Sequence, residues 1–258
     1  MTYTVRQEAE RIHRLAWTAQ YAAAPREFTE ATGLRVAELA EGVSQYFLPA
    51  VPYRMFNRVL GLGITTLLTE ELIDTALANF AQAGCEAIAL SLTESEPAEK
   101  LTARGLVPID EWVLLTRATE PPYTPASDLE VIEADPETFG SVLAKGYEVP
   151  DAIAAWGAAL VGCLGWKTYL ACDGTQAVGC AAMFLADELA WFGPAATLPE
   201  SRGRGAQSAC FARRIADAHA LGCRLIVIEA APGSTSHRNM LRAGFTELGR
   251  RVNFGVPE

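Results

Sequence analysis

The stretch Pro199-Glu200-Ser201-Arg202-Gly203-Arg204-Gly205-Ala206-Gln207-Ser208 decides the fold of this chain. It follows an apolar, strand-like segment and leads into a long helical pattern. Glycines allow tight turns and close approach of the backbone to a ligand. The first turn of a helix leaves unpaired N–H groups and a partial positive charge. A glycine loop between a strand and a helix therefore predicts a phosphate-binding site.

Other readings of this loop are weaker. An Arg-Gly surface loop without a ligand is the plain alternative, but the strand–loop–helix context favours a binding site. A Walker loop is excluded because the chain has no G-x-x-x-x-G-K-[ST] sequence. A Rossmann fingerprint is excluded because Ser208 stands where the third glycine is needed.

An internal repeat surrounds the loop. Residues 81–92 and 219–230 each read as a helix end, a Gly-Cys turn and an apolar strand. Further on, residues 104–106 match residues 243–245, and both are followed by a strand-like run. Left-handed glycines are expected after the predicted helices, at positions 84, 105, 222 and 244. The two halves therefore share one order of elements.

Residues 119–130 contain three prolines and read as a linker. We place a boundary near Pro125, which predicts domains at 1–125 and 126–258. The second half predicts a strand at 129–134, helices at 136–146 and 151–164, and strands at 167–174, 177–186 and 188–198. This order indicates an α/β (α+β) fold with a mixed, mostly antiparallel sheet flanked by helices.

Residues 199–208 resemble motif A of the GCN5-related N-acetyltransferases, written [QR]-x-x-G-x-[GA]. Arg202 and Gly205 match its first two fixed positions, and Gln207 replaces the final Gly or Ala. Residues 129–258 follow the element order of that family, and residues 239–245 resemble the end of its motif B. The resemblance implies two tandem domains of this type, of which the first is degenerate.

The resemblance also implies acetyl-CoA as cosubstrate. Its pyrophosphate would lie on the amides of residues 203–208, and its pantetheine arm would follow one of two splayed strands. The cofactor-binding residues expected on this basis are Ala195, Ala196, Thr197, Leu198, Arg202, Gly203, Arg204, Gly205, Ala206, Gln207, Ser208 and Asn239. When Gly84 is aligned with Gly222, the loop falls on residues 64–69, which have no glycine or arginine. The first half is therefore expected to bind no cofactor.

The catalytic residues are less defined. Met240 and Gly193 stand where many members of the family have a tyrosine acid and a glutamate. We rank Glu229 and His237 first as substitutes, although each could be an ordinary strand-end or helix-start residue. Further candidates are Tyr147, Glu148, Glu188, Ser236 and Asn239. Backbone amides near Ala196 and Thr197 could also help the reaction without any side chain.

The composition limits the partners. The chain has 258 residues, of which 50% are hydrophobic and 20% charged, so it can bury a core. Its net charge of −10 argues against a nucleic-acid surface. No apolar run of about 18 residues predicts a membrane span, and the charged N-terminal segment is unlike a signal peptide. Six cysteines without a CxxC pair and three histidines without zinc-like spacing favour free thiols in the cytoplasm and no metal.

These observations predict an acetyl-CoA-dependent N-acetyltransferase that acts on a small-molecule amine. An acidic surface and an aromatic region containing Trp156, Trp166, Trp191 and Phe192 favour such an acceptor. The alternatives are a non-catalytic acyl-CoA sensor or interaction module and a protein N-terminal acetyltransferase. The tandem arrangement fits a monomer or a homodimer. The apolar residues at 46–52 fit either a core, which is favoured, or an interface between the halves.

Overall fold

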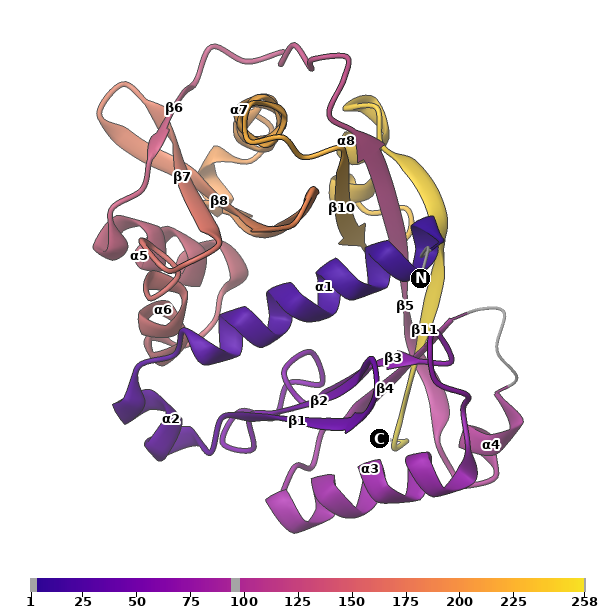
Figure 1. Ribbon diagram of the computed structural model, residues 1–258. Helices are drawn as coiled ribbons and strands as arrows, with labels where there is room; N and C mark the ends of the chain where they lie inside the picture. Colours follow the sequence, from indigo (N-terminus) through magenta and orange to yellow (C-terminus); the bar gives the residue numbers. More distant parts are fainter. Residues whose placement is uncertain (1–3, 94–97, 258) are drawn as a thin grey trace.

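The structure is a computed structural model that describes residues 4–93 and 98–257. Its centre is one 11-stranded sheet (Figure 1). The strands are β1 (Arg35–Ala40), β2 (Val43–Phe47), β3 (Arg58–Leu62), β4 (Ala89–Thr93), β5 (Val107–Ala118), β6 (Glu130–Glu133), β7 (Trp166–Asp173), β8 (Gln176–Ala186), β9 (Leu189–Thr197), β10 (Leu225–Ala230) and β11 (Thr246–Gly255). The helices are α1 (Val5–Ala22), α2 (Arg26–Thr32), α3 (Glu70–Ala83), α4 (Glu99–Thr102), α5 (Pro136–Tyr147), α6 (Asp151–Ala158), α7 (Ala206–Ala220) and α8 (Thr235–Arg242).

The two halves of the chain exchange their last strands. The spatial order of the sheet is β1-β2-β3-β4-β11-β5-β10-β9-β8-β7-β6. Strand β5 pairs antiparallel with both β10 and β11, and β11 in turn pairs antiparallel with β4. The two half-sheets are thereby joined into one, and hydrogen bonds between the halves run through its middle.

The internal repeat is confirmed. Strand β3 pairs parallel with β4, and β9 pairs parallel with β10. Helix α3 connects the first pair and α7 connects the second. The four expected glycines have φ angles of 72° at Gly84, 76° at Gly105, 81° at Gly222 and 83° at Gly244. Each therefore adopts the left-handed conformation that ends a helix without a Cβ clash.

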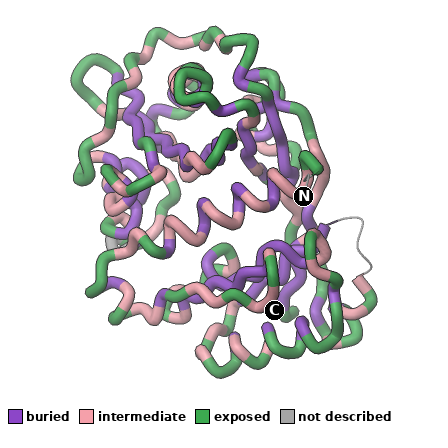
Figure 2. The backbone as a smooth tube through the Cα atoms, in the orientation of Figure 1, coloured by how far each residue is buried: buried purple, intermediate pink, exposed green. Residues whose placement is uncertain are grey.

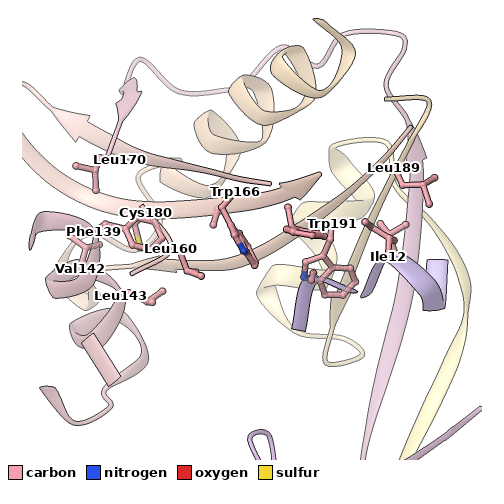
Figure 3. Packing of buried hydrophobic residues seen from close by; sticks show 14 of the residues in the cluster. Ile12, Phe139, Val142, Leu143, Leu160, Trp166, Leu170, Cys180, Leu189 and Trp191 are labelled. Atoms are coloured by element: carbon pink, nitrogen blue, oxygen red, sulfur yellow. The ribbon is translucent and has the colours of Figure 1, made fainter. Parts of the chain in front are cut away.

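Helix α1 is the main element that the sequence reading did not predict. Thr4 and Gln7 form a capping box at its start, which satisfies free amides of the first turn. Its buried face includes Ala9, Ile12 and Ala16, spaced as one side of a helix. Figure 3 shows Ile12 beside Trp191 of β9, and both belong to one hydrophobic cluster. Helix α1 contacts β9 and β10 of the second half as well as β1 and β3 of the first.

Burial follows the layers of the fold. Figure 2 shows the central strands mostly buried, whereas the linker at 119–128 and the outer face of α3 are largely exposed. Tyr46 and Leu48 are fully buried and pack with Trp17 and Trp156. Because Trp156 comes from the second half, this part of the 46–52 segment is core at a contact between the halves.

Two elements of the second half are shorter than the sequence predicted. The helix expected at 151–164 ends at Ala158, and turns follow in which Gly162 and Gly165 have φ angles of 78° and 81°. The strand expected at 129–134 spans Glu130–Glu133. None of the described helices combines the length and the apolar character that a membrane crossing requires.

Candidate active site

The N-terminus of α7 is open to an anion. Gly205 is its N-cap residue, with φ 85°, and no side chain of the described residues caps the helix. Gly203 has φ 82°, and a Cβ at this position would meet nothing within 4 Å. The free amides of the first turn and the partial positive charge of the helix end favour a phosphate here.

The N-terminus of the equivalent helix in the first half, α3, is capped by a side chain. The hydroxyl of Thr69 accepts a hydrogen bond of 3.2 Å from the amide of Leu72 at the start of α3. A side-chain cap of this kind satisfies amides that a phosphate would otherwise use. The local structure thus gives a physical reason to expect anion binding in the second half alone.

The two arginines of the loop lie beside this helix end. Arg202 donates to the carbonyl of Gly146 at 3.1 Å and lies 3.7 Å from Glu148, and Arg204 pairs with Asp173. The arginine side chains are 56% and 52% exposed. Exposed ion pairs contribute little stability, so both cations can turn toward a bound anion at small cost.

Side-chain hydrogen bonds also connect the first turn of α7 to α8. The side-chain amide of Gln207 donates to the hydroxyl of Ser236 at 2.8 Å, and its oxygen accepts from Nδ2 of Asn239 at 2.6 Å. The hydroxyl of Ser208 lies 2.8 Å from that of Tyr123 in the linker. Asn239 is thus connected to the loop through Gln207, as expected for neighbouring parts of one site. Ala206 is buried beneath this turn.

Strands β9 and β10 separate beside the loop. Their pairing ends at Trp191 and Val227. Beyond this point β8 is the only described strand that pairs with β9. The register of that pairing shifts at residues 193–194 of β9. The splay expected from the sequence is therefore present. It leaves one edge of β9 open along residues 192–197.

Four consecutive residues of this edge were expected to hold the pantetheine arm. The amide of Leu198 donates to the carbonyl of Val178 at 3.0 Å, on the β8 side. The amide of Ala195 instead donates to the hydroxyl of Tyr147 at 3.4 Å, on the open side. Because backbone directions alternate along a strand, Thr197 shares the open side with Ala195, and Ala196 faces β8 with Leu198.

A cavity of about 390 Å³ lies next to the splay. Both halves of the chain line it, and Pro194, Ala195 and Gln207 connect it to the phosphate loop. Eight of the 24 residues that line it are aromatic, including Trp17, Tyr53, Phe56, Trp112, Trp156 and Trp191. Of the aromatic residues expected at the site, Trp166 lies elsewhere and packs on Phe184 with 5.2 Å between ring centroids.

Glu229 is the less exposed of the two carboxylates that line this cavity, with 9% of its side chain exposed against 72% for Glu148. Its Oε2 accepts from Arg251 at 2.5 Å, and its Oε1 lies 3.2 Å from Nε2 of His13 and 3.9 Å from Arg58. Burial alone would raise the pKa of Glu229, but His13, Arg251 and Arg58 outweigh it and hold the pKa well below the usual range. Glu229 is therefore a carboxylate that already has partners, and it is a weak base.

The charges around Glu229 balance. Arg251 also donates to both oxygens of Glu10, at 2.9 and 2.8 Å. Two carboxylates, from Glu10 and Glu229, thus face two guanidinium groups, from Arg58 and Arg251. Because the cluster carries no net charge, it does not favour a cationic ligand over a neutral one.

His13 lies beside Glu229 and is one of several residues near the cavity that the sequence analysis missed. It is fully buried, and burial lowers its pKa to about 4 despite the nearby carboxylate of Glu229. At neutral pH its ring is therefore uncharged. Its position on the buried face of α1 is the only signal that the sequence offers, and that signal is shared by every core residue of an amphipathic helix.

His237 lies outside the cavity. Its Nδ1 accepts from the amide of Gly233 at 3.1 Å, and its Nε2 lies 3.0 Å from Glu247. Nδ1 therefore faces the loop that precedes α8, and Nε2 faces the start of β11. The structure does not bring His237 together with Glu229, and these contacts account for its burial.

The remaining candidates divide between the cavity and the surface. Tyr147, Glu148 and Ser236 line the cavity, as do Gly193 and Met240. Tyr147 is 48% exposed, and its phenol keeps its proton at neutral pH because a tyrosine hydroxyl ordinarily ionises only at about pH 10. Glu188 lies at the far end of β9 and pairs with Arg224 at 3.3 Å, away from the splay.

No group of three or more His, Cys, Asp or Glu side chains in the described segments could hold a metal ion. All six cysteines are free thiols.

Comparisons with solved structures show which proteins share this fold. No family model matches the sequence, and no curated protein matches it. A GCN5-related N-acetyltransferase from Kribbella flavida has 17% identity and a TM-score of 0.61, covering 93% of this chain and 96% of that one. One from Sphaerobacter thermophilus has 15% identity and a TM-score of 0.60, covering 98% and 93%.

A tandem protein of the same type, from the clavulanic acid biosynthesis pathway, has 16% identity and a TM-score of 0.56. The match covers 95% of this chain and 94% of that protein. The expected fold is therefore confirmed over nearly the whole length: this chain has the tandem fold of the GCN5-related N-acetyltransferases.

Proposed function

We propose that this protein transfers an acetyl group from acetyl-CoA to the amine of a small molecule. One observation carries the proposal. The uncapped N-terminus of α7 and the open edge of β9 lead into a single cavity, which Glu229 lines. An anion site, an extended binding edge and an acceptor pocket thus follow one another in the order that a CoA thioester and an amine require.

The backbone would do most of the binding. The amides at 203–208 suit a diphosphate, and Arg202 and Arg204 add positive charge beside it. The open edge of β9 at Ala195 and Thr197 offers backbone groups to the pantetheine amides. Acetyl-CoA supplies the acetyl group as a reactive thioester. The amide of Ala195 and the hydroxyl of Tyr147 are donors on the same edge, where they can stabilise a developing oxyanion.

The acceptor is expected to react as a neutral amine. Glu229 can accept a hydrogen bond from it and orient it, but the low pKa of Glu229 prevents it from holding the amine proton. Water at the mouth of the cavity would take that proton. Positioning of the two reactants then supplies a large part of the rate enhancement.

The cavity also indicates the kind of amine. Its wall is mainly apolar and includes eight aromatic residues, and the Glu229 cluster carries no net charge. A small amine with an apolar or aromatic group fits such a wall better than a polycation or a peptide terminus. We further propose that the protein works as a monomer in a reducing compartment, because its halves share one sheet and its six thiols are free.

The test combines binding and turnover. Isothermal titration calorimetry with CoA should show binding, and a panel of apolar and aromatic amines should release free CoA from acetyl-CoA. Failure of well-folded protein to bind CoA would refute the proposal. Binding without acceptor-dependent release would instead identify a non-catalytic acyl-CoA sensor, and acetylated peptides from a cell extract would identify a protein acetyltransferase.

A further inference from the structure

Arg214 of α7 is fully buried, and no carboxylate among the described residues forms an ion pair with it. It donates to the carbonyls of Ala182 at 2.9 Å and Cys210 at 3.2 Å, and its guanidinium lies 4.3 Å from the ring centroid of Phe192. Its Nη2 is buried and has no hydrogen-bond partner in residues 4–93 and 98–257. No carboxylate in the described part of the chain lies within 4.0 Å of it.

Burial of a charge without a counter-ion is unfavourable in free energy, so a functional reason for Arg214 is expected. A buried charge ordinarily needs a counter-ion, as Arg251 has in Glu10 and Glu229. The ionisable groups that face Arg214 are thiols and phenols: Cys210 on its own helix, Cys180 on β8, Tyr169 on β7 and Tyr147 on α5. Desolvation raises the pKa of Tyr169, Cys180 and Cys210, and the half-exposed phenol of Tyr147 ordinarily ionises only at about pH 10, so all four stay neutral at neutral pH. Burial lowers the pKa of Arg214 to about 10, so it stays charged at neutral pH.

The unpaired donor lies where the proposed reaction develops negative charge. Arg214, Phe192 and Met240 line the same cavity. Phe192 is the first residue of β9 beyond its pairing with β10, so Arg214 stands beside the beginning of the splay. Met240 occupies the position at which the resemblance places a tyrosine acid, and a thioether has no proton to give.

The proposed transfer requires help at the sulfur. The amine nitrogen attacks the thioester carbon, and a tetrahedral intermediate forms. The C–S bond then breaks, its electron pair stays on sulfur, and the amine proton leaves to water. The products are an amide and the CoA thiolate, which takes a proton from solvent after release.

We propose that Nη2 of Arg214 binds the departing CoA sulfur as a thiolate, so that a buried cation replaces the missing proton donor. This inference rests on the proposed function. It explains why a guanidinium is held in the core without a counter-ion, since the anion that completes it would arrive with the substrate.

The test measures the ionisation of bound CoA rather than turnover. The ultraviolet absorbance of the thiolate reports the thiol pKa when the CoA complex is titrated with base. In the wild-type complex this pKa should lie at least one unit below that of free CoA, a tenfold change in ionisation. Arg214→Met should abolish the shift, Arg214→Lys should retain part of it, and Arg213→Met should leave it intact, because Arg213 pairs with Asp217 on the outer side of α7.

A second measurement separates the sulfur from the rest of the cofactor. Arg214→Met should weaken the binding of CoA but not that of desulfo-CoA. Replacement of an unpaired buried cation by an apolar side chain of similar length is often neutral or stabilising, and the melting temperature checks that the variant folds. If it does not fold, the wild-type thiol pKa and the Arg214→Lys variant still decide the question.

Three outcomes would overturn the inference. Bound CoA could have an unshifted thiol pKa in the wild type. The shift could persist in Arg214→Met. Arg214→Met could lose succinyl-CoA affinity selectively, which would assign Arg214 to a carboxylate on the acyl group. In each case CoA still binds, so the proposed function survives, whereas no CoA binding at all would refute that function first.

Discussion

The imidazole of His13 stacks on the indole of Trp191, with 4.2 Å between ring centroids and 29° between planes. This contact joins α1, at the start of the chain, to β9 at the point where β9 leaves β10. The same imidazole lies 3.2 Å from Glu229. The first helix therefore helps to build the part of the cavity around Glu229, although the phosphate loop belongs to the second half.

The buried state of His13 predicts a pH-dependent stability. Its pKa is about 4 in the folded protein against an ordinary value of 6.5. As the pH falls from 7 to 5, the unfolded chain takes up a proton that the folded protein refuses, so the free energy of unfolding should fall by about 2 kcal/mol from this residue. Urea denaturation of the wild type and of His13→Gln at both pH values measures the contribution of His13 to the free energy of unfolding.

The His13→Gln variant should lose most of that pH dependence between pH 7 and 5. His219→Gln is the matched control, because the side chain of His219 is 55% exposed, and it should keep the wild-type slope. Glu229 acts at lower pH: its folded pKa lies below the ordinary 4.5, so its contribution is lost only as the pH falls below that value. Equal slopes in His13→Gln and the wild type would contradict the prediction.

The ion pair of Glu229 with Arg251 predicts a large and non-additive effect on stability. Glu229→Gln leaves two buried guanidinium groups with less compensation and should lower the free energy of unfolding by about 3–5 kcal/mol. The double variant with Arg251→Met should lose about 0.5–3 kcal/mol less than the sum of the single changes, because the residues interact directly. Additive losses in denaturation experiments would show that the two side chains are not coupled.

The phosphate loop predicts a loss of cofactor affinity upon charge reversal. Arg204→Glu places a negative charge beside the open end of α7 and should weaken CoA binding at least tenfold, or about 1.4 kcal/mol. Leu67→Glu is the control, since this residue occupies the equivalent loop of the first half and is 83% exposed. Calorimetry should give wild-type affinity for the control, and an unchanged affinity in Arg204→Glu would argue against the site.

The cap of the first-half helix predicts an effect on stability alone. Thr69→Ala removes the hydroxyl that accepts from Leu72 and should cost about 1 kcal/mol of folding stability. Thr69→Ser keeps an equivalent hydroxyl and should retain most of it. Neither change should alter CoA affinity in calorimetry. A loss of affinity in Thr69→Ala with full recovery in Thr69→Ser would mean that the first half takes part in binding.

The shared cavity predicts that a residue of the first half controls the acceptor. Trp112 lies on β5 and lines the cavity from the first half of the sequence. Trp112→Ala removes part of the aromatic wall and should raise the KM for an apolar amine severalfold while the CoA affinity stays unchanged. Leu164→Ala, at a residue that is 94% exposed, should leave both quantities as they are in the wild type.

The sequence by itself determined the local features of this protein. The Arg-Gly loop, the repeat, the left-handed glycines and the order of strands and helices in the second half were readable, because each depends on residues close together in the chain. A glycine-rich turn before a helix has much the same physical properties in any surrounding. The open helix end at Gly205 and the capped one at Thr69 follow from those few residues.

Only the tertiary structure decided how these parts form a site. The exchange of β5 and β11, the burial of His13 beside Glu229 and the solitary charge of Arg214 all depend on residues far apart in the sequence. The aromatic wall likewise combines Trp17 and Trp112 with Trp156. Contacts of this kind leave no local pattern, because many pairings of apolar segments satisfy the same periodicity until the whole sheet is assembled.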